Sequence, residues 1–339
     1  MQKTVAIILA LAFLLAGCAQ EPQSAPEQPR PRQTRALQLA VREAVSEDAM
    51  RGIEAFVETA AAVSEGALQI ETVRCADPIA ALDAGSDLIF LSNAEVARAN
   101  GDFLSYASPF YFLNETHLSA TLNSGEFVSR IRDKTQSLLG AAPLAAFYGG
   151  SGIFLSNESE GLDTVEGWEG IRIFIGEGND LLSVVLEKFG ASVTGRAAET
   201  LMDGFLSRSF RTIECDPAEL LRLTGDTIGG YPVVAYRTMH AAQIDWLMLS
   251  AEAEVSLSAW EQAVLTEAAA AALAANDTAV TAREAAAFEY AESLGVAVYE
   301  IDYDAFCEQA DEAFLSAVRY RNLWDWDLHS NVRDFARLN

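Results

Sequence analysis

AFYGGSGIFLSNESEGLDTVEGWEGIRIFIGEG, residues 146–178, contains two apolar runs, and each run ends in glycines. The first run ends at Tyr148, and the second spans residues 171–175. Strand alternation places the three isoleucines of the second run on one face and Arg172 and Phe174 on the other. We therefore expect two strands that open into glycine turns, at residues 149–152 and 176–178. In α/β proteins such strand ends usually frame a ligand site.

The flanking sequence alternates between strand and helix patterns. Strands are expected at residues 38–41, 68–73, 88–91, 144–148, 171–175, 211–214, 231–236 and 296–301, and residues 246–249 are expected to carry the chain back across the domain boundary. Helices are expected after Ser46 and at residues 78–83, 126–138, 181–189, 197–205 and 304–320, and from Pro217. The apolar run at 88–91 is typical of a strand that is buried on both faces of a parallel sheet. This order predicts an α/β fold.

The longest helical pattern spans residues 258–295. Ser258 and Glu261 fit a capping box, and alanine and glutamate dominate the residues that follow. A continuous helix of this length would extend about 54 Å at ~1.5 Å per residue. A break near Asn276 would fit the sequence equally well.

Composition and charge limit the classes of function. The chain has 339 residues, of which 50% are hydrophobic, so it is long enough to form two domains with buried cores. Its formal net charge is -26, which disfavours nucleic acid and anionic lipid head groups as partners. We expect neither a cofactor nor a metal site, because the three histidines lie far apart and no C-x-x-C motif occurs.

The amino terminus has the features of a lipoprotein export signal. Lys3 precedes an apolar run, and the sequence Leu-Ala-Gly-Cys ends at Cys18. We expect residues 1–17 to be cleaved, Cys18 to carry the lipid, and residues 18–35, rich in Pro, Gln and Glu, to form a flexible tether. The expected location is the periplasmic side of a bacterial membrane.

Several motifs, all in the same order, resemble the solute-binding proteins of TRAP transporters (the DctP type). The segments that carry the resemblance are SPFYF at residues 108–112, SN at 156–157, GWEGIRIFIG at 167–176, NDLLSVVLEKFGA at 179–191 and LSAEAEVSLSAWEQAVLTEAA at 249–269. The resemblance covers residues 38–319. It implies a protein that binds a small solute outside the cytoplasm and passes it to a TRAP membrane permease.

The resemblance also implies an α/β, two-lobed periplasmic-binding-protein-like fold of type II character, with mixed central sheets and a long helix spanning both lobes. Domain I would comprise residues 36–157 and 246–283, and domain II residues 158–245 and 284–322. Residues 323–339 would form a tail without an assigned role.

This sequence departs from the family at the positions that usually hold a carboxylate. Family members commonly use two arginines, because guanidinium makes paired hydrogen bonds to both carboxylate oxygens. Those positions fall at Gly152 and Phe174 in this chain. Arg172 lies nearby on the same strand, and it either acts as a displaced clamp or faces solvent or an acidic partner.

Two acidic residues strengthen this departure. Glu214 takes the place of the family's glutamine, and Asp216 takes the place of its ligand-contacting asparagine. Carboxylates beside a carboxylate ligand would repel it and would be costly to desolvate. We therefore expect a ligand that is neutral, apolar or cationic rather than a simple organic anion.

The remaining candidate ligand residues are Arg42, Ser92, Asn93, Tyr148 and Trp246, which correspond to cleft positions or lie beside them. An enzyme is not expected, because the sequence around Ser151 only approaches G-x-S-x-G and no His or Asp partner is placed with it. An alternative function is a divergent orphan scaffold, acting as a sensor, a carrier of lipid or hydrophobic ligand, or an interaction lipoprotein.

Outside Cys18 the chain has Cys75, Cys215 and Cys307. An odd number of cysteines outside the cytoplasm allows one disulfide and one thiol, or three buried thiols. By family topology Cys215 and Cys307 fall in the same domain, so this pair is the expected disulfide if one forms.

Overall fold

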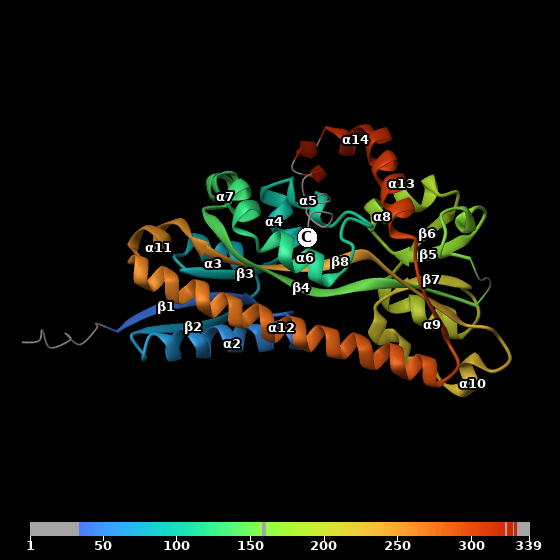
Figure 1. Cartoon of the computed structure of the whole chain (residues 1–339), viewed down its shortest axis with the longest axis horizontal. Helices are drawn as coiled ribbons and strands as arrows, with labels where there is room; N and C mark the ends of the chain where they lie inside the picture. The colour runs from blue at the N-terminus through green and yellow to red at the C-terminus, as the bar shows by residue number, and fades with distance from the viewer. Residues whose placement is uncertain (1–33, 158–160, 323, 328, 331–339) are drawn as a thin grey trace, which may run out of the picture. The chain divides into compact units, whose positions relative to one another are not determined.

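A mixed β-sheet runs through the part of the chain that the computed structural model describes, residues 34–157, 161–322, 324–327, 329 and 330. Within these residues the strand order is β2-β1-β3-β8-β4-β7-β5-β6, with β9 paired to β8 (Figure 1). The strands are β1 (Arg35–Arg42), β2 (Leu68–Cys75), β3 (Leu88–Ser92), β4 (Ala141–Ser156), β5 (Arg172–Gly176), β6 (Ser192–Arg196), β7 (Thr212–Cys215), β8 (Val234–Ser250) and β9 (Ala297–Glu300).

The predicted glycine turn at residues 149–152 is wrong, because β4 continues through it to Ser156. β4 and β8 pair antiparallel from Ala141↔Ser250 to Ser156↔Val234, with register shifts at Tyr148/Gly150 and Ser151/Ile153. Extra residues in one strand of a pair bend it without ending it. The glycines therefore allow the irregular pairing of β4 with β8, and Gly150 adopts φ +113°.

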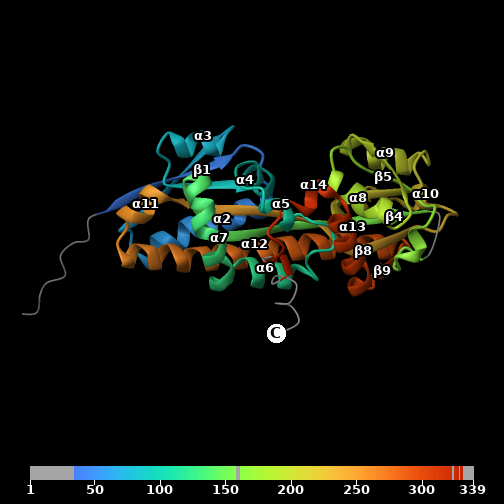
Figure 2. The same ribbon diagram turned by 90° about the horizontal axis from the view of Figure 1, so that it is seen from above.

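The strand predicted at residues 231–236 is likewise the start of a longer strand, β8, which continues through residues 246–249, the segment predicted to cross the domain boundary. Residues 239–243, Met-His-Ala-Ala-Gln, lack the alternation of a half-buried strand. For this reason the sequence pattern did not predict that the strand continues through them. As a result, β4 and β8 link the two ends of the sheet, where parallel strands β1, β2 and β3 lie at one end and β5, β6 and β7 at the other (Figure 2).

The helices cover the sheet as the alternating pattern predicts. Their bounds are α2 (Glu47–Val63), α3 (Pro78–Asp83), α4 (Asn93–Ala99), α5 (Phe103–Tyr106), α6 (Glu115–Leu122), α7 (Gly125–Leu139), α8 (Asp180–Lys188), α9 (Leu201–Leu206), α10 (Gly225–Ile228), α11 (Ala251–Ser256), α12 (Ala259–Ser293), α13 (Tyr303–Ser316) and α14 (Val318–Arg321), with 3-10 turns η1 (Glu166–Trp168), η2 (Ala198–Thr200) and η3 (Pro217–Arg222). The predicted helix at 197–205 is divided into η2 and α9, and Pro217 begins a 3-10 turn rather than an α-helix.

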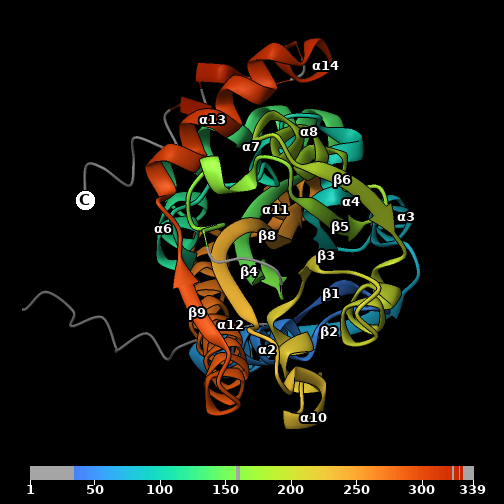
Figure 3. The same cartoon turned by 90° about the vertical axis from the view of Figure 1, so that its right-hand side faces the viewer.

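The long helix α12 is continuous over 35 residues, with no break at Asn276. Ser258 and Glu261 form the predicted capping box, in which the Ser258 hydroxyl accepts from Glu261 N at 3.3 Å and Glu261 Oε2 accepts from Ser258 N at 2.7 Å. The helix packs on α2, β4, η3 and β9. Figure 3, a view from the side of β5 and β6, shows α12 beside α2. The predicted helix spanning both parts of the fold is confirmed.

Four clusters of buried side chains form the core. Two of them lie around β1, β3 and the first half of β4, and two lie around β5, β7 and the second half of β4. From Arg35 onward the chain forms one compact unit, so the predicted division into residues 36–157 and 246–283 against 158–245 and 284–322 stays a prediction. Among the described residues, no helix is both long and apolar enough to cross a bilayer.

The sequence left open one disulfide or three thiols, and no disulfide forms among the cysteines that the structure describes. Cys75, Cys215 and Cys307 remain thiols, and Cys215 and Cys307 belong to β7 and α13, which pack in different regions of the core. Burial raises the pKa of Cys215 well above its usual value, which favours the protonated thiol. The predicted signal peptide, Cys18 and nearly all of the tether lie outside the described residues.

The packing of α2 on α12 makes a testable prediction at Gly52. A Cβ there would lie 2.6 Å from Phe147 Cε1 and 3.0 Å from the Ala272 carbonyl oxygen. Gly52→Ala should therefore lower the free energy of unfolding by about 1–3 kcal/mol, measured by urea denaturation. The control is Gly125→Ala at the start of α7, where a Cβ meets no atom within 4 Å and no loss is expected. Equal effects of the two substitutions would contradict this account of the α2–α12 contact.

Candidate functional site

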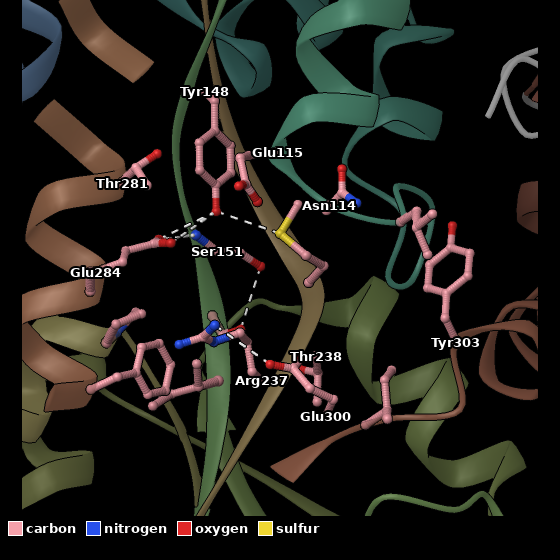
Figure 4. Close-up of a pocket in the computed structure, with 18 residues that line it drawn as sticks. Asn114, Glu115, Tyr148, Ser151, Arg237, Thr238, Thr281, Glu284, Glu300 and Tyr303 are labelled. Atoms are coloured by element: carbon pink, nitrogen blue, oxygen red, sulfur yellow. Dashed lines mark hydrogen bonds and ion pairs between the residues drawn. The ribbon is translucent and has the colours of Figure 1, made fainter. Parts of the chain in front are cut away.

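Two cavities lie along the β4–β8 strand pair, and Gly152 is the one residue that lines both. The first, which we call the cleft cavity, has a volume of about 580 Å³. It is lined by Ala107, Gly152, Gly176, Glu177, Asn179, Leu181, Ala198, Glu199, Leu201, Met202, Glu214, Cys215, Asp216, Glu219, Ala241, Ala242 and Gln243. The second, which we call the Tyr148 cavity, is lined by residues of β4, β8, β9, α12 and the chain before α6 (Figure 4).

The cleft cavity forms where β5 and β7 end. Gly176 is the last residue of β5, and Glu214 lies one residue before the end of β7. Asn179 caps α8 by accepting from Leu182 N, and Asp216 caps η3 by accepting from Ala218 N. The carboxyl ends of neighbouring parallel strands meet at one edge of the sheet, so these residues converge. Of the predicted site residues, Glu214, Asp216 and Gly152 line this cavity, and their role in binding stays a prediction.

The charge of the cleft cavity is one-sided. Its lining includes no lysine or arginine. Five carboxylate side chains line it, those of Glu177, Glu199, Glu214, Asp216 and Glu219. An anion that entered would meet repulsion from several directions, whereas a cation would find several partners.

Glu214 is the most constrained of these carboxylates. Its Oε2 accepts from Gly176 N at 3.1 Å, its Oε1 accepts from Asn179 Nδ2 at 3.4 Å, and His240 Nε2 lies 3.7 Å from Oε1. Burial raises the pKa of Glu214, but His240 and the donors from Gly176 and Asn179 outweigh burial, so the net pKa lies below its usual value. Glu214 is therefore an ionised carboxylate at neutral pH.

His240 lies directly behind Gly152. Its ring is fully buried, stacks on Phe154 at 4.0 Å between centroids, and pairs through Nδ1 with the Thr238 hydroxyl at 2.5 Å. A Cβ at position 152 would lie 3.0 Å from His240 Nε2. The imidazole thus occupies the space into which a side chain at position 152 would extend, and glycine is the residue that fits.

Arg283 joins the edge of the cleft cavity to the opposite end of the sheet. Its Nε donates to Asp48 in α2 at 2.7 Å, its Nη1 to Asp216 at 3.3 Å, and its Nη2 to the Gly149 carbonyl at 3.0 Å. Three acceptors from separate elements hold the guanidinium, and Arg283 is not among the residues lining the cavity. Its charge balances Asp48 and Asp216, which leaves Glu214 without a basic side chain other than His240 within ion-pair distance among the described residues.

Arg172 and Phe174 lie away from both cavities. Phe174 is buried and stacks on Phe210 with 3.9 Å between ring centroids, and Arg172 is exposed with its guanidinium 5.0 Å from the Phe174 ring. The position that usually holds the family's second arginine is therefore part of a buried aromatic contact in this chain.

Arg42, Ser92, Asn93 and Trp246 gather at the carboxyl ends of β1 and β3. Arg42 pairs with Asp245 at 2.8 Å, and Ser92 caps α4. Asn93 Nδ2 donates to the Phe103 carbonyl at 2.7 Å, and Asn93 Oδ1 accepts from Trp246 Nε1 at 3.0 Å. Trp246 is fully buried. These four side chains line neither cavity, and their contacts are those of capping, ion pairing and core packing.

Asp245, the partner of Arg42, is itself buried. Burial raises the pKa of Asp245 to about 6, although the Arg42 guanidinium opposes this shift. Asp245 therefore carries its proton more readily than an exposed aspartate as the pH falls toward 6.

Tyr148 lies in the second cavity. It is 1% exposed, and its hydroxyl donates to Glu284 at 3.3 and 3.4 Å. Nearby, the Ser151 hydroxyl donates to the Gly152 carbonyl at 3.4 Å, while His240 pairs with Thr238. Contacts among the described residues thus do not place Ser151 and His240 as nucleophile and base.

Sequence reasoning missed His240, Arg283, Asn179 and three of the carboxylates. For Arg283 a signal was present, since it is the one basic residue in the 35 residues of α12. A lone cation in an alanine-rich helix indicates a specific acidic partner. His240 offered no comparable signal, because its position depends on the irregular pairing of β8 with β4.

Comparison with known proteins gives one family and many similar folds. A family model described as "DctP: Bacterial extracellular solute-binding protein, family 7" matches residues 43–320. A search of curated protein sequences found no match.

Among solved structures, a TRAP periplasmic solute-binding protein from Rhodobacter sphaeroides in an apo open form is 14% identical with a TM-score of 0.75, covering 89% of this chain and 96% of that one. One from Escherichia fergusonii, also apo and open, is 15% identical with a TM-score of 0.71, covering 88% and 99%. One from a Sulfitobacter species with bound β-D-galacturonate is 20% identical with a TM-score of 0.60, covering 88% and 100%. At these identities the likeness shows the fold alone, and it agrees with the predicted fold class.

The Arg283 contacts make a second prediction. Arg283→Gln leaves Asp48, which is 8% exposed, without its cation, so the free energy of unfolding should fall by about 1–3 kcal/mol in urea denaturation. Arg222→Gln is the control, because Arg222 pairs with exposed Asp203 and Glu219 and a surface pair contributes about 0–1 kcal/mol. If the two substitutions lower the free energy of unfolding equally, the ion pair of Arg283 with Asp48 contributes no more than a surface ion pair.

Proposed function

The chain belongs to family 7 of the bacterial extracellular solute-binding proteins, and we propose that it captures a small cationic or neutral polar solute in the cleft cavity for delivery to a TRAP-type membrane permease. The family is one of binding proteins, so we assign no catalytic residue. The observation that carries the ligand class is the lining of the cleft cavity, with five carboxylates and no lysine or arginine.

Glu214 supports this ligand class most directly. The backbone N–H of Gly176 and the amide of Asn179 are the kind of neutral donors that a ligand carboxylate would use at a strand end. Here they already bind the Glu214 carboxylate. A carboxylate ligand would have to displace Glu214 from these donors or accept its repulsion. A cationic group, in contrast, would gain an ionised and pre-positioned partner.

Solved relatives make the contrast with this ligand class concrete. One is described with bound β-D-galacturonate and another with D-erythronate, both of which are carboxylates at neutral pH. In this chain the two positions usual for carboxylate-binding arginines are Gly152 and Phe174, and neither carries a cation. The guanidiniums of Arg172 and Arg196 lie over the Phe174 ring, but neither residue lines the cleft cavity. His240 fills the space beside Gly152, and Phe210 covers Phe174.

The lining also argues against the alternative of a lipid or hydrophobic-ligand carrier. Burying an apolar chain against five carboxylates would strip those carboxylates of water without giving them hydrogen bonds. A cavity lined by five carboxylates fits a small, water-soluble solute better than an apolar chain.

We further propose that the two ends of the sheet close around the solute by bending at the crossing segments, and that a permease recognises the closed form. β4 and β8 carry register shifts beside the cavity, and Met239 in β8 adopts φ +46°, a conformation that non-glycine residues rarely adopt. Irregular pairing at this place offers fewer regular hydrogen bonds to resist bending.

The ligand class is tested by a thermal-shift screen followed by calorimetry on the proteins without their signal peptide. Small amines, amino alcohols and quaternary ammonium compounds should include binders, and C4-dicarboxylates and sugar acids should not. Glu214→Gln removes the charge while its amide oxygen still accepts from Gly176, so it should weaken cation binding by about tenfold or more. Glu126→Gln, on the exposed face of α7, is the control and should leave affinity unchanged.

Tight binding of galacturonate or a dicarboxylate, with no amine bound, would refute the proposed ligand class. It would leave the family assignment intact.

We also propose that Cys18 carries a lipid that holds the protein at the periplasmic side of a bacterial membrane. In cells expressing the full chain, Cys18→Ala should move the protein from the membrane fraction to the soluble fraction, detected by immunoblotting after ultracentrifugation. The solute affinity of the purified protein should not change, because Cys18 is not among the residues that line the cleft cavity. A wild-type chain found in the soluble fraction would contradict the anchor.

A further inference from the structure

The Tyr148 cavity is a second, partly open space that the proposed function does not use. Its volume is about 250 Å³. Figure 4 shows side chains from several elements pointing into it, with Tyr148 and Ser151 from β4, Glu284 from α12 and Tyr303 from the start of α13. It shares no lining residue with the cleft cavity except Gly152.

Its polar lining is built from buried groups. Tyr148, Ser151 and Thr238 are 1%, 5% and 2% exposed, respectively. Glu284 Oε1 accepts from Ser151 N at 3.1 Å, and both of its oxygens lie within hydrogen-bond distance of the Tyr148 hydroxyl. These donors hold the carboxylate of Glu284 in one orientation beside the cavity.

The cavity contains acidic charge without a matching cation. Its one basic residue, Arg237, pairs with Glu300 at 3.5 Å and lies 4.1 Å from the centre of the Phe288 ring. Among the described residues, Glu284 and Glu115 take part in no ion pair.

Both hydrogen bonds to Glu284 come from neutral donors, and the adjacent Arg283 directs its guanidinium to Asp48, Asp216 and the Gly149 carbonyl. Burial raises the pKa of Glu284, which records the free-energy cost of its negative charge in this place.

The rest of the wall suits a cation that carries apolar groups. Tyr148 and Tyr303 present aromatic rings, and Met239 presents a thioether whose sulfur lies 3.5 Å from the Tyr148 hydroxyl. The Tyr303 hydroxyl donates to the Tyr111 carbonyl at 2.9 Å, which fixes the position of its ring. Aromatic faces attract ammonium groups, and polarizable sulfur tolerates methyl groups.

We propose that the Tyr148 cavity is a second binding site, for a small organic ammonium ion, with Glu284 as its counter-ion and Tyr148, Tyr303 and Met239 around its apolar groups. The ligand is small, because the volume of the Tyr148 cavity is only about 250 Å³. Hydrogen bonds from Ser151 and Tyr148 pre-organise the carboxylate, so the site needs little rearrangement to accept a cation. This site does not depend on the ligand proposed for the cleft cavity.

Methionine methyl groups offer a probe in each cavity, because Met239 lines the Tyr148 cavity and Met202 lines the cleft cavity. Protein labelled with ¹³C at its methionine methyls is titrated with tetramethylammonium chloride in NMR spectra, with sodium chloride at equal ionic strength as the salt control. Met239→Leu and Met202→Leu assign the two signals. We expect a saturable shift of the Met239 signal with tetramethylammonium and none with sodium.

Glu284→Gln removes the charge but keeps an oxygen that accepts from Ser151 N, so the fold should be retained, as verified by its melting curve. In this variant the concentration of tetramethylammonium needed for half of the Met239 shift should rise by about tenfold or more. Glu126→Gln on α7 is the matched charge control and should respond as the wild type does.

Two outcomes would overturn the proposal: a Met239 signal that does not move in the wild-type protein, or one that moves equally in Glu284→Gln. Met202 is followed in the same spectra during titration with solutes for the cleft cavity. Failure of the proposed cleft function is therefore seen at Met202 and is distinguishable from failure at the second site.

Discussion

The continuous pairing of β4 with β8 is the constraint on which the rest of the structure depends. Each strand crosses from one end of the sheet to the other, and their backbone hydrogen bonds hold both ends in one sheet. Where the register shifts, Gly150 and Gly152 let neighbouring groups approach closely. Arg283 and Glu284 fill the space beside Gly150, and His240 fills the space beside Gly152. Both cavities are consequences of this irregular segment.

The arrangement of charged side chains at the cleft cavity follows from the close approach of His240 to Gly152 and of Arg283 to Gly150. Because His240 occupies the space at Gly152, no side chain at that position can reach a ligand, and His240 instead faces Glu214 at 3.7 Å. Arg283 reaches Asp216 from the far side but is held by Asp48 and the Gly149 carbonyl as well. The Arg283 guanidinium near the cavity is therefore already engaged with groups of the protein itself. A solute would meet the acidic side of this arrangement.

Much of the fold could be predicted from the sequence, because local patterns determined it. Alternation located β1, β3 and β5, and the capping box located the start of α12. The pattern failed where tertiary pairing overrides local preference. Gly149 and Gly150 favour a turn by themselves, yet pairing with Gln243 keeps them within a strand. Glu214 and Asp216 could be predicted as candidate site residues, because the order of the motifs located them. Arg283 and His240 were missed, because they approach the cavity from distant parts of the sequence.

The net charge of -26 and the acidic cleft cavity have different physical consequences. A surplus of exposed carboxylates raises the concentration of every cation near the surface, but salt screens this effect within about 8 Å at physiological ionic strength. It therefore speeds encounter without selecting one cation from another. Selection requires a carboxylate that is shielded from salt and fixed in direction, as Glu214 is by Gly176 and Asn179. Under the proposed function, specificity for a solute would depend on an oriented, half-buried acid such as Glu214 and not on the acidic surface that surrounds it.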